Sequence, residues 1–199
     1  MMEPVGLVLV GFGNVGQAFA QLLLEKQAEL AEKYGMRCHV NGIMTGRHGA
    51  AINPDGIDLE EALRIVREGG QLKQLDASDF SGDTLDFIQQ SPGDVMVETT
   101  PVNPRSGQPA LEHMRAALSK GMHAITANKG PVVYGFQELT ALASGKGRKF
   151  LFESAVMDGA PIFSLFRQPL AGARLLGFSG ILNSCTNLLL ERMEAGETL

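Results

Sequence analysis

Three glycines near the N-terminus are spaced as in a phosphate-binding loop. They form the pattern G-x-G-x-x-G over residues 11–16. Gly11 permits a tight turn, Gly13 lets the backbone approach a pyrophosphate, and Gly16 lets a helix pack closely on a strand. The pattern alone also suits a plain strand-to-helix turn, but an apolar run precedes it and a helical stretch follows it, which favours dinucleotide binding. The predicted cofactor contacts here are Gly11, Phe12, Gly13, Asn14, Val15 and Gly16.

The segment after the second predicted strand, residues 45–48, bears on which dinucleotide is bound. NAD sites usually carry an Asp or Glu there, which hydrogen-bonds the ribose 2′-hydroxyl. This segment reads Thr-Gly-Arg-His and contains no acid. The planar guanidinium of Arg47 can pair with a 2′-phosphate, which favours NADP over NAD, although a solvated loop arginine gives the same pattern. We interpret His48 as a surface neighbour and not as a catalyst.

Polar residues follow the next two predicted strands. In doubly wound sheets, ligands bind outside the carboxyl ends of the strands. Thr99, Thr100 and Pro101 are therefore expected to contact the nicotinamide ribose, although threonine and proline also serve turns. Lys129 can position a substrate oxygen and stabilise the charge that develops on it during hydride transfer, against the alternative of a solvent-facing lysine. Its neighbour Asn128 is also expected to contact the cofactor.

Apolar runs alternate with helical stretches over most of the chain, which is typical of a parallel α/β sheet. The predicted strands are Gly6–Val10, Arg37–Met44, Asp94–Glu98, His123–Thr126 and Lys149–Glu153. The predicted helices are Asn14–Lys33, Leu59–Glu68, Pro109–Lys120 and Phe136–Ser144. These elements predict an NAD(P)-binding Rossmann domain, a doubly wound parallel sheet, over residues 1–150.

The pattern changes after Glu153. Pro161 suits the first turn of a helix, the segment Leu175–Asn183 predicts a strand, and Thr186–Glu194 predicts another helix. We interpret residues 151–199 as the incomplete beginning of a second, α+β domain.

The composition excludes several classes of protein. The 199 residues are 44% hydrophobic and carry a net charge of −5, so a nucleic-acid or anionic-membrane partner is disfavoured. The two cysteines, Cys38 and Cys185, lie far apart and indicate neither a disulfide framework nor a zinc site. No signal peptide or membrane-length apolar run is present in the sequence, which predicts a cytoplasmic protein.

Several of these segments together resemble the homoserine dehydrogenase family. The resemblance covers the glycine loop and the stretch from Glu98 to Glu194, through ETTPVN, GQPALEHMRAAL, GMHAITANKGPV, FESAVMDGAPI and GILNSCTNLLLERM. It implies reversible interconversion of L-homoserine and L-aspartate 4-semialdehyde with NAD(P), on the route to threonine and methionine. It also implies a homodimer whose second domain holds the substrate site and the dimer contact.

The resemblance further implies roles for individual residues. The lysine of the TANK motif corresponds to Lys129, which is then the catalytic residue and contacts both cofactor and substrate. The other implied substrate contacts are Glu153, Asn183, Ser184 and Cys185. A monovalent cation such as sodium is implied at the backbone oxygens of Glu153, Val156, Asp158 and Ala160.

Two departures from the family pattern leave alternatives open. Ser184 and Cys185 stand where the family usually has glycine and threonine, which bears on substrate preference. The family's acidic Glu-Ala-Asp-Pro motif and a further catalytic Asp and Lys are expected beyond Leu199. A cofactor-binding module without catalysis is therefore one alternative. A semialdehyde dehydrogenase with Cys185 as nucleophile is another, although no histidine base follows that cysteine.

Overall fold

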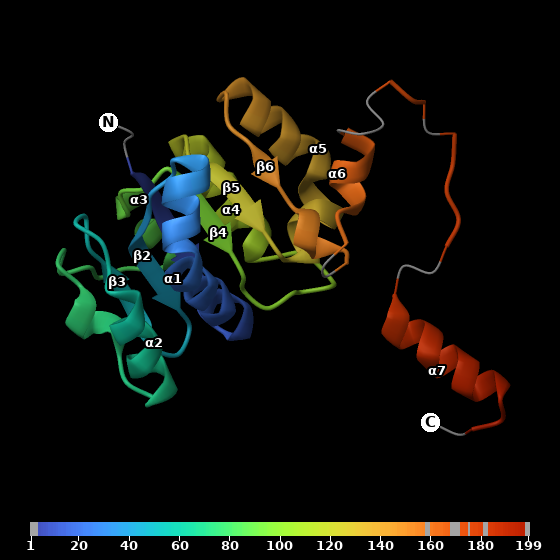
Figure 1. Ribbon diagram of the computed structural model, residues 1–199, viewed down its shortest axis with the longest axis horizontal. Coiled ribbons are helices and arrows are strands. Elements are labelled where there is room, and N and C mark those ends of the chain that lie inside the picture. The colour runs from blue at the N-terminus through green and yellow to red at the C-terminus, as the bar shows by residue number, and fades with distance from the viewer. Residues whose placement is uncertain (1–3, 158–159, 168–171, 175, 181–182, 198–199) are drawn as a thin grey trace. The chain divides into compact units, whose positions relative to one another are not determined.

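The chain divides into two compact units in the computed structural model, one up to Phe152 and one from Glu153 onward. The structure describes residues 4–157, 160–167, 172–174, 176–180 and 183–197 (Figure 1).

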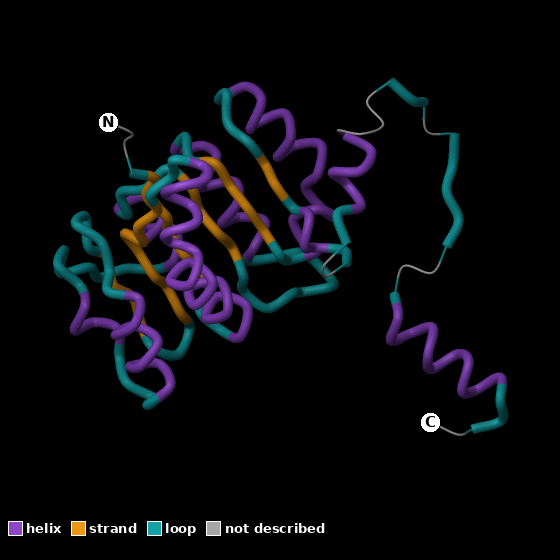
Figure 2. The backbone as a smooth tube through the Cα atoms, viewed as in Figure 1, coloured by secondary structure: helices purple, strands orange, loops and turns teal. Residues whose placement is uncertain are grey.

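The first unit is built on a six-stranded sheet in the order β3-β2-β1-β4-β5-β6. Its strands are drawn in orange in Figure 2. The strands are β1 (Val5–Val10), β2 (Cys38–Thr45), β3 (Gly49–Ile52), β4 (Val95–Glu98), β5 (His123–Thr126) and β6 (Phe150–Leu151). All neighbouring pairs are parallel except β2 and β3, which are antiparallel. The predicted α/β, doubly wound fold is confirmed. The strand order reverses between β1 and β4, which is where such folds bind ligands.

Helices pack on both faces of this sheet. They are α1 (Asn14–Tyr34), α2 (Leu59–Arg67), α3 (Thr84–Gln90), α4 (Ala110–Lys120) and α5 (Lys129–Gly145), with a short 3-10 helix η1 (Leu72–Leu75). Leu9 and Ile43 share one apolar core with residues of α1 and α2. The adjacent Gly42 faces the other way, where an added Cβ would lie 2.8 Å from the Phe87 ring of α3. Side chains alternate along a strand, so α3 covers the face opposite α1.

A hairpin between β2 and β3 is the main difference from the prediction, which expected no strand between residues 45 and 80. Thr45 pairs with Gly49 across the hairpin, and Gly49 has a φ of +70°. The Leu72 N–H donates to the His48 carbonyl at 2.8 Å, and the His48 ring contacts the Gly70 carbonyl at 2.8 Å. The tip of the hairpin, which carries Arg47, is therefore tied to the segment that follows α2.

Asp76 fastens β3 to the chain beyond η1. Its buried carboxylate accepts the Ile52 N–H at 2.8 Å and the Phe80 N–H at 2.7 Å, and it pairs with Lys73 at 3.0 Å. Burial alone would raise the pKa of Asp76, but these hydrogen bonds outweigh it and lower the pKa to about 2.

We expect Asp76→Asn to lower the free energy of unfolding by about 2 kcal/mol at pH 7. The folded-state pKa is depressed, so the stabilisation is present above the ordinary value of 3.8 and is lost as the pH falls towards about 2. Urea denaturation of the unaltered protein and of the variant at several pH values measures whether their free energies of unfolding converge as the pH falls. The matched control is Asp79→Asn, because Asp79 also pairs with Lys73 but its side chain is 99% exposed. A difference that stayed constant with pH would contradict the prediction.

Helix α5 begins at Lys129 and not at Phe136 as predicted. The Asn128 side chain accepts the Gly130 N–H, which caps the helix, and Pro131 is tolerated in the first turn. Helix α3 was not predicted at all. It starts with a capping box between Asp83 and Asp86, in which aspartate takes the place of the more common glutamate.

The described part of the second unit contains η2 (Glu153–Ala155), α6 (Ile162–Arg167) and α7 (Ser184–Glu194). The strand predicted over Leu175–Asn183 is wrong for residues 176–180, which form no strand, while residues 175, 181 and 182 lie outside the described residues. A strand exists through pairing, and none of the described residues pairs with this segment. The α+β character of a second domain stays a prediction.

Candidate functional site

A cleft of about 810 Å³ opens at the carboxyl ends of β1, β2 and β4. It brings together most of the predicted cofactor contacts: Gly11, Phe12, Gly13, Asn14, Val15, Arg47, Thr99, Thr100 and Pro101. Its lining also includes residues that the sequence did not single out, among them Met44, Val66, Thr84, Pro109 and His113. Gly16, Asn128 and Lys129 do not line it. The cleft lies at the switch point of the sheet, the position expected for a dinucleotide.

The glycines of the loop differ in what surrounds them. Gly11 has a φ of +97°, and a Cβ added there would lie 2.7 Å from the Thr99 carbonyl carbon. A Cβ on Gly16 would lie 2.5 Å from the Gly11 carbonyl oxygen. A Cβ on Gly13 would meet nothing within 4 Å, so this residue faces open space. Gly11 and Gly16 are therefore needed for the close approach of β1, α1 and β4, whereas Gly13 leaves room for a ligand.

The first turn of α1 suits an anion. Gly13 is the N-cap and provides no side-chain cap, and the turn contains no acidic residue. The first N–H groups of a helix have no partner within the helix, and its dipole favours negative charge. A pyrophosphate fits this arrangement of free N–H groups beside a glycine that faces open space.

Arg47 has a fixed backbone and an uncommitted side chain. The Thr45 hydroxyl oxygen accepts the Arg47 N–H at 3.3 Å and the His48 N–H at 2.7 Å. Gln71 donates to the Arg47 carbonyl at 3.2 Å. The exposed guanidinium forms no ion pair or hydrogen bond with any residue that the structure describes. The hairpin thus holds a free cation at the cleft, beside the carboxyl end of β2.

A buried network, which we call the carboxyl-edge brace, joins the ends of β4 and β5. It consists of Glu98, Thr100, Thr126 and Asn128. Glu98 accepts the Thr100 N–H at 2.8 Å, the Thr100 hydroxyl, and the Thr126 hydroxyl at 2.7 Å. Burial raises the pKa of Glu98, and these hydrogen bonds oppose the rise. Sequence reasoning missed Glu98 and Thr126, because a buried carboxylate in an apolar strand gives no spacing signal.

Asn128 completes the brace and positions the loop that follows β4. Its amide nitrogen donates to the carbonyls of Thr100 at 3.0 Å and Pro101 at 3.3 Å, and its amide oxygen accepts the Gly130 N–H. Its polar atoms are thus engaged within the protein, and direct cofactor contact by Asn128 stays a prediction. Lys129 follows directly and is exposed at the first position of α5.

Apart from Lys129, the residues predicted for substrate and cation fall in the second unit. The Glu153 carboxylate accepts the N–H groups of Phe163 and Ser164 and the Ser164 hydroxyl, so it caps α6. The Ala160 carbonyl accepts the Ile162 N–H at 2.9 Å, Val156 is half-buried, and Asp158 lies outside the described residues. No group of three or more metal-binding side chains occurs among the residues described. A cation held by backbone oxygens stays a prediction.

The segment 183–185 opens α7. The Asn183 side chain accepts the Thr186 N–H at 2.9 Å and caps the helix, which begins at Ser184. Cys185 is exposed in the first turn. The helix predicted over Thr186–Glu194 therefore begins two residues earlier, and Cys185 lies within its first turn and not before it.

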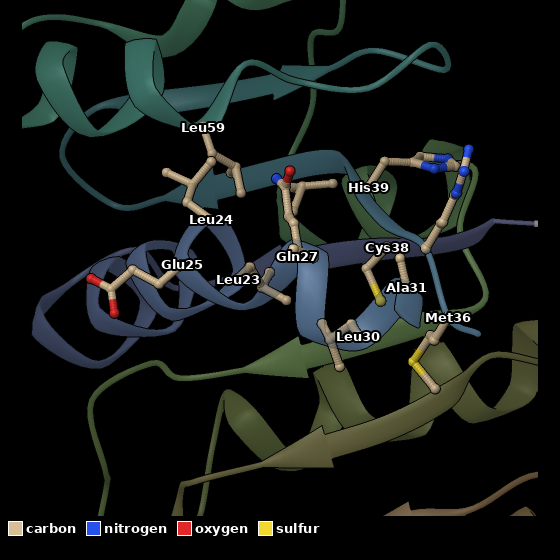
Figure 3. A pocket seen from close by; sticks show the side chains of 13 residues that line it. Leu23, Leu24, Glu25, Gln27, Leu30, Ala31, Met36, Cys38, His39 and Leu59 are labelled. Carbon is tan, nitrogen blue, oxygen red and sulfur yellow. The ribbon is translucent and has the colours of Figure 1, made fainter. Parts of the chain in front are cut away.

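A second cleft, of about 600 Å³, lies between α1 and the start of β2 (Figure 3). Its labelled lining includes Leu23, Leu24, Leu30, Met36, Cys38 and His39. It lies at the amino ends of the strands and has no glycine loop. Burial raises the pKa of the Cys38 thiol, which disfavours a nucleophilic thiolate. Cofactor chemistry is therefore assigned to the first cleft.

Comparison with known proteins decides the family. Residues 11–153 match the family model described as the NAD-binding domain of homoserine dehydrogenase. The chain belongs to the homoserine dehydrogenase family. An NAD(+)-dependent homoserine dehydrogenase from Pseudomonas canavaninivorans is 36% identical over 98% of this chain. A homoserine dehydrogenase from Methanocaldococcus jannaschii is 35% identical over 94% of it. The chain spans 55% of the length of each of these two relatives.

The fold agrees with solved structures of homoserine dehydrogenases. A hyperthermophilic archaeal homoserine dehydrogenase in complex with NADPH superposes with a TM-score of 0.70 and 28% identity. The match covers 85% of this chain and 50% of that one. No helix within the described residues is both long and apolar enough to cross a membrane.

Proposed function

We propose that this chain provides the cofactor-binding unit, residues 1–150, and the beginning of the substrate unit, residues 151–199, of an NADP(H)-dependent homoserine dehydrogenase. The reaction is the interconversion of L-homoserine and L-aspartate 4-semialdehyde. Family membership supports the reaction class. The observation that supports the phosphorylated cofactor is the Arg47 guanidinium, which pairs with none of the described residues and lies beside a β2 terminus that has no acidic residue.

The relatives differ in the cofactor that their names specify. The Pseudomonas enzyme is described as NAD(+)-dependent, whereas the archaeal structure contains NADPH. For this chain, the proposal of NADP over NAD therefore rests on Arg47 at the tip of the hairpin. A guanidinium pairs with a phosphate through two parallel hydrogen bonds, and it gains nothing comparable from a ribose hydroxyl.

We expect Arg47→Ala to weaken NADPH binding by roughly tenfold and to leave NADH binding nearly unchanged. The reason is that only NADPH carries the 2′-phosphate. Titration calorimetry with each nucleotide measures the two dissociation constants. Arg37→Ala is the matched control, because Arg37 lines the second cleft. Equal losses for both nucleotides would show that Arg47 does not distinguish them.

The residues of this chain have separate tasks in the proposed reaction. A dinucleotide held in this cleft would supply the hydride acceptor for the oxidation of the substrate at its C4, and the hydroxyl proton would leave to a base or to solvent. The first turn of α1 binds the pyrophosphate, and residues 99–101 support the nicotinamide ribose. Lys129 orients the reacting oxygen and stabilises the negative charge that develops on it. The carboxyl-edge brace fixes the position of Lys129 relative to residues 99–101, because Asn128 hydrogen-bonds to the Thr100 carbonyl and directly precedes Lys129.

Three further features belong to the same proposal. Asn183, Ser184 and Cys185 contact the amino-acid substrate together with Glu153. A monovalent cation binds the backbone oxygens of Glu153, Val156, Asp158 and Ala160, and the Ala160 carbonyl retains one lone pair beside its bond to Ile162. The enzyme is a homodimer.

The deciding experiment is NADP-dependent oxidation of L-homoserine by this polypeptide, with its intact mass verified in the same sample. Turnover supports the proposed activity. NADPH binding without turnover at the verified mass supports a cofactor-binding module that requires further residues for catalysis. Turnover by Cys185→Ala excludes the cysteine-nucleophile mechanism, because a covalent thiol intermediate cannot form in that variant.

A further inference from the structure

The wall of the cofactor cleft includes a buried histidine, His113, that has no part in the proposed reaction. His113 of α4 is only 4% exposed, and it lines the cleft. Its Nδ1 is shielded from solvent and has no hydrogen-bond partner in the described part of the chain. Buried polar groups are almost always paired, and an unpaired one costs about 1–3 kcal/mol. Because Nδ1 is shielded, a ligand in the cleft can reach the ring only through Nε2, which forms no hydrogen bond with the described residues. An imidazole with an unused nitrogen in the wall of a ligand cleft points to contact with the ligand.

The surroundings of His113 place it on the adenosine side of the cleft. Helix α4, which carries His113, packs against α3. Thr84, in the first turn of α3, also lines the cleft. Helix α3 packs against β2 through Phe87 and Gly42, and β2 leads to the hairpin tip with Arg47. The nicotinamide side, marked by Thr100 and Lys129, lies towards β4 and β5.

The charge state of the ring limits what it can bind. Burial lowers the pKa of His113, although the carboxylates of Glu112 and Asp83 oppose this. The imidazole is therefore neutral near pH 7 and offers one donor and one acceptor. A neutral ring gains little from a phosphate. The edge of an adenine offers an amino donor and ring-nitrogen acceptors, which complement it.

We propose that the imidazole of His113 hydrogen-bonds the adenine base of the bound dinucleotide and so positions the adenosine half of the cofactor. This inference rests on the proposed binding of NADP(H). It assigns to α4 a recognition role separate from that of Arg47, which reads the 2′-phosphate, and from that of the glycine loop, which binds the pyrophosphate.

The test compares His113→Phe and His113→Gln with the unaltered chain. Phenylalanine keeps an aromatic ring and removes both nitrogens, whereas glutamine keeps a donor and an acceptor. Calorimetric dissociation constants are measured for NADPH and for adenosine 2′,5′-bisphosphate, which contains the adenosine half alone. We expect His113→Phe to weaken both ligands by a similar factor of about 10, and His113→Gln to recover most of the loss. His39→Phe is the matched control, because His39 lines the second cleft (Figure 3).

The outcomes separate this inference from the proposed function. If the unaltered chain does not bind NADPH, the proposed function fails first. If it binds NADPH and His113→Phe binds both ligands equally well, the role of His113 is overturned. A loss confined to NADPH also overturns it, because His113 would then act on the nicotinamide half. A loss in both ligands that glutamine does not restore, together with a lower unfolding temperature, marks a packing role and overturns it as well.

Discussion

Replacing Lys129 with alanine is expected to lower the turnover of L-homoserine by about 10²–10³-fold while NADPH affinity changes little. The expected loss is that of one charged donor at the oxygen on which charge develops. The side chain is exposed and does not line the cofactor cleft, so we expect NADPH affinity to depend little on it. Steady-state rates with saturating NADP, together with NADPH titrations of the same samples, measure the two effects separately.

The matched control for Lys129 is Lys146→Ala. Lys146 is the C-cap at the opposite end of the same helix, so its replacement tests for a general effect of charge removal on α5. Its turnover is expected to match that of the unaltered protein. Equal losses of turnover and of cofactor affinity in Lys129→Ala would instead make Lys129 a cofactor-binding residue only.

Alanine at Gly11 is expected to lower the free energy of unfolding by about 3 kcal/mol, combining a strained positive φ with overpacking. The added Cβ would lie 2.7–2.8 Å from Thr99 atoms, most of them backbone, which cannot move aside as a flexible side chain can. Urea denaturation followed by circular dichroism measures the loss. An unchanged denaturation midpoint would mean that β1 and β4 are not held together through Gly11.

Gly13→Ala is the matched control, and it is expected to separate stability from binding. Gly13 has φ −80° and ψ −154°, which alanine adopts readily, and an added Cβ meets nothing. The free energy of unfolding should stay the same or rise slightly, because alanine restricts the unfolded chain. NADPH binding should weaken by roughly tenfold or more, because the methyl group occupies the space left for the pyrophosphate.

Sequence reasoning succeeded where a local pattern has a single structural meaning. The apolar run before Gly11 and the helical stretch after it define a strand, a turn and a helix, and these lie within a residue or so of the prediction. Gly121 ends α4 in a left-handed conformation, as its position predicted. The regular alternation of elements predicted that the remaining strands are parallel, but not their order in the sheet.

The failures share a physical cause, which is that tertiary partners decide the structure. Strand β3 has the sequence GAAI, with little intrinsic strand preference, and it exists because β2, η1 and Asp76 hold it. Leu176–Gly180 contains apolar residues at strand-like spacing but has no pairing partner among the described residues. His113 lies on the apolar face of α4 with Ala110, Met114 and Ala117. The sequence pattern is therefore consistent with its burial, but it gives no sign that His113 lines the cleft.

The hairpin turn at residues 45–48 has a consequence for how cofactor preference evolves. The Thr45 hydroxyl stabilises the turn by accepting two backbone N–H groups, and an aspartate carboxylate accepts the same pair in an Asx-turn. Aspartate at this strand terminus is also the residue that binds an unphosphorylated ribose. Replacing this one threonine by aspartate is therefore expected to preserve the turn and introduce the acid, so a change of cofactor preference need not destabilise the hairpin.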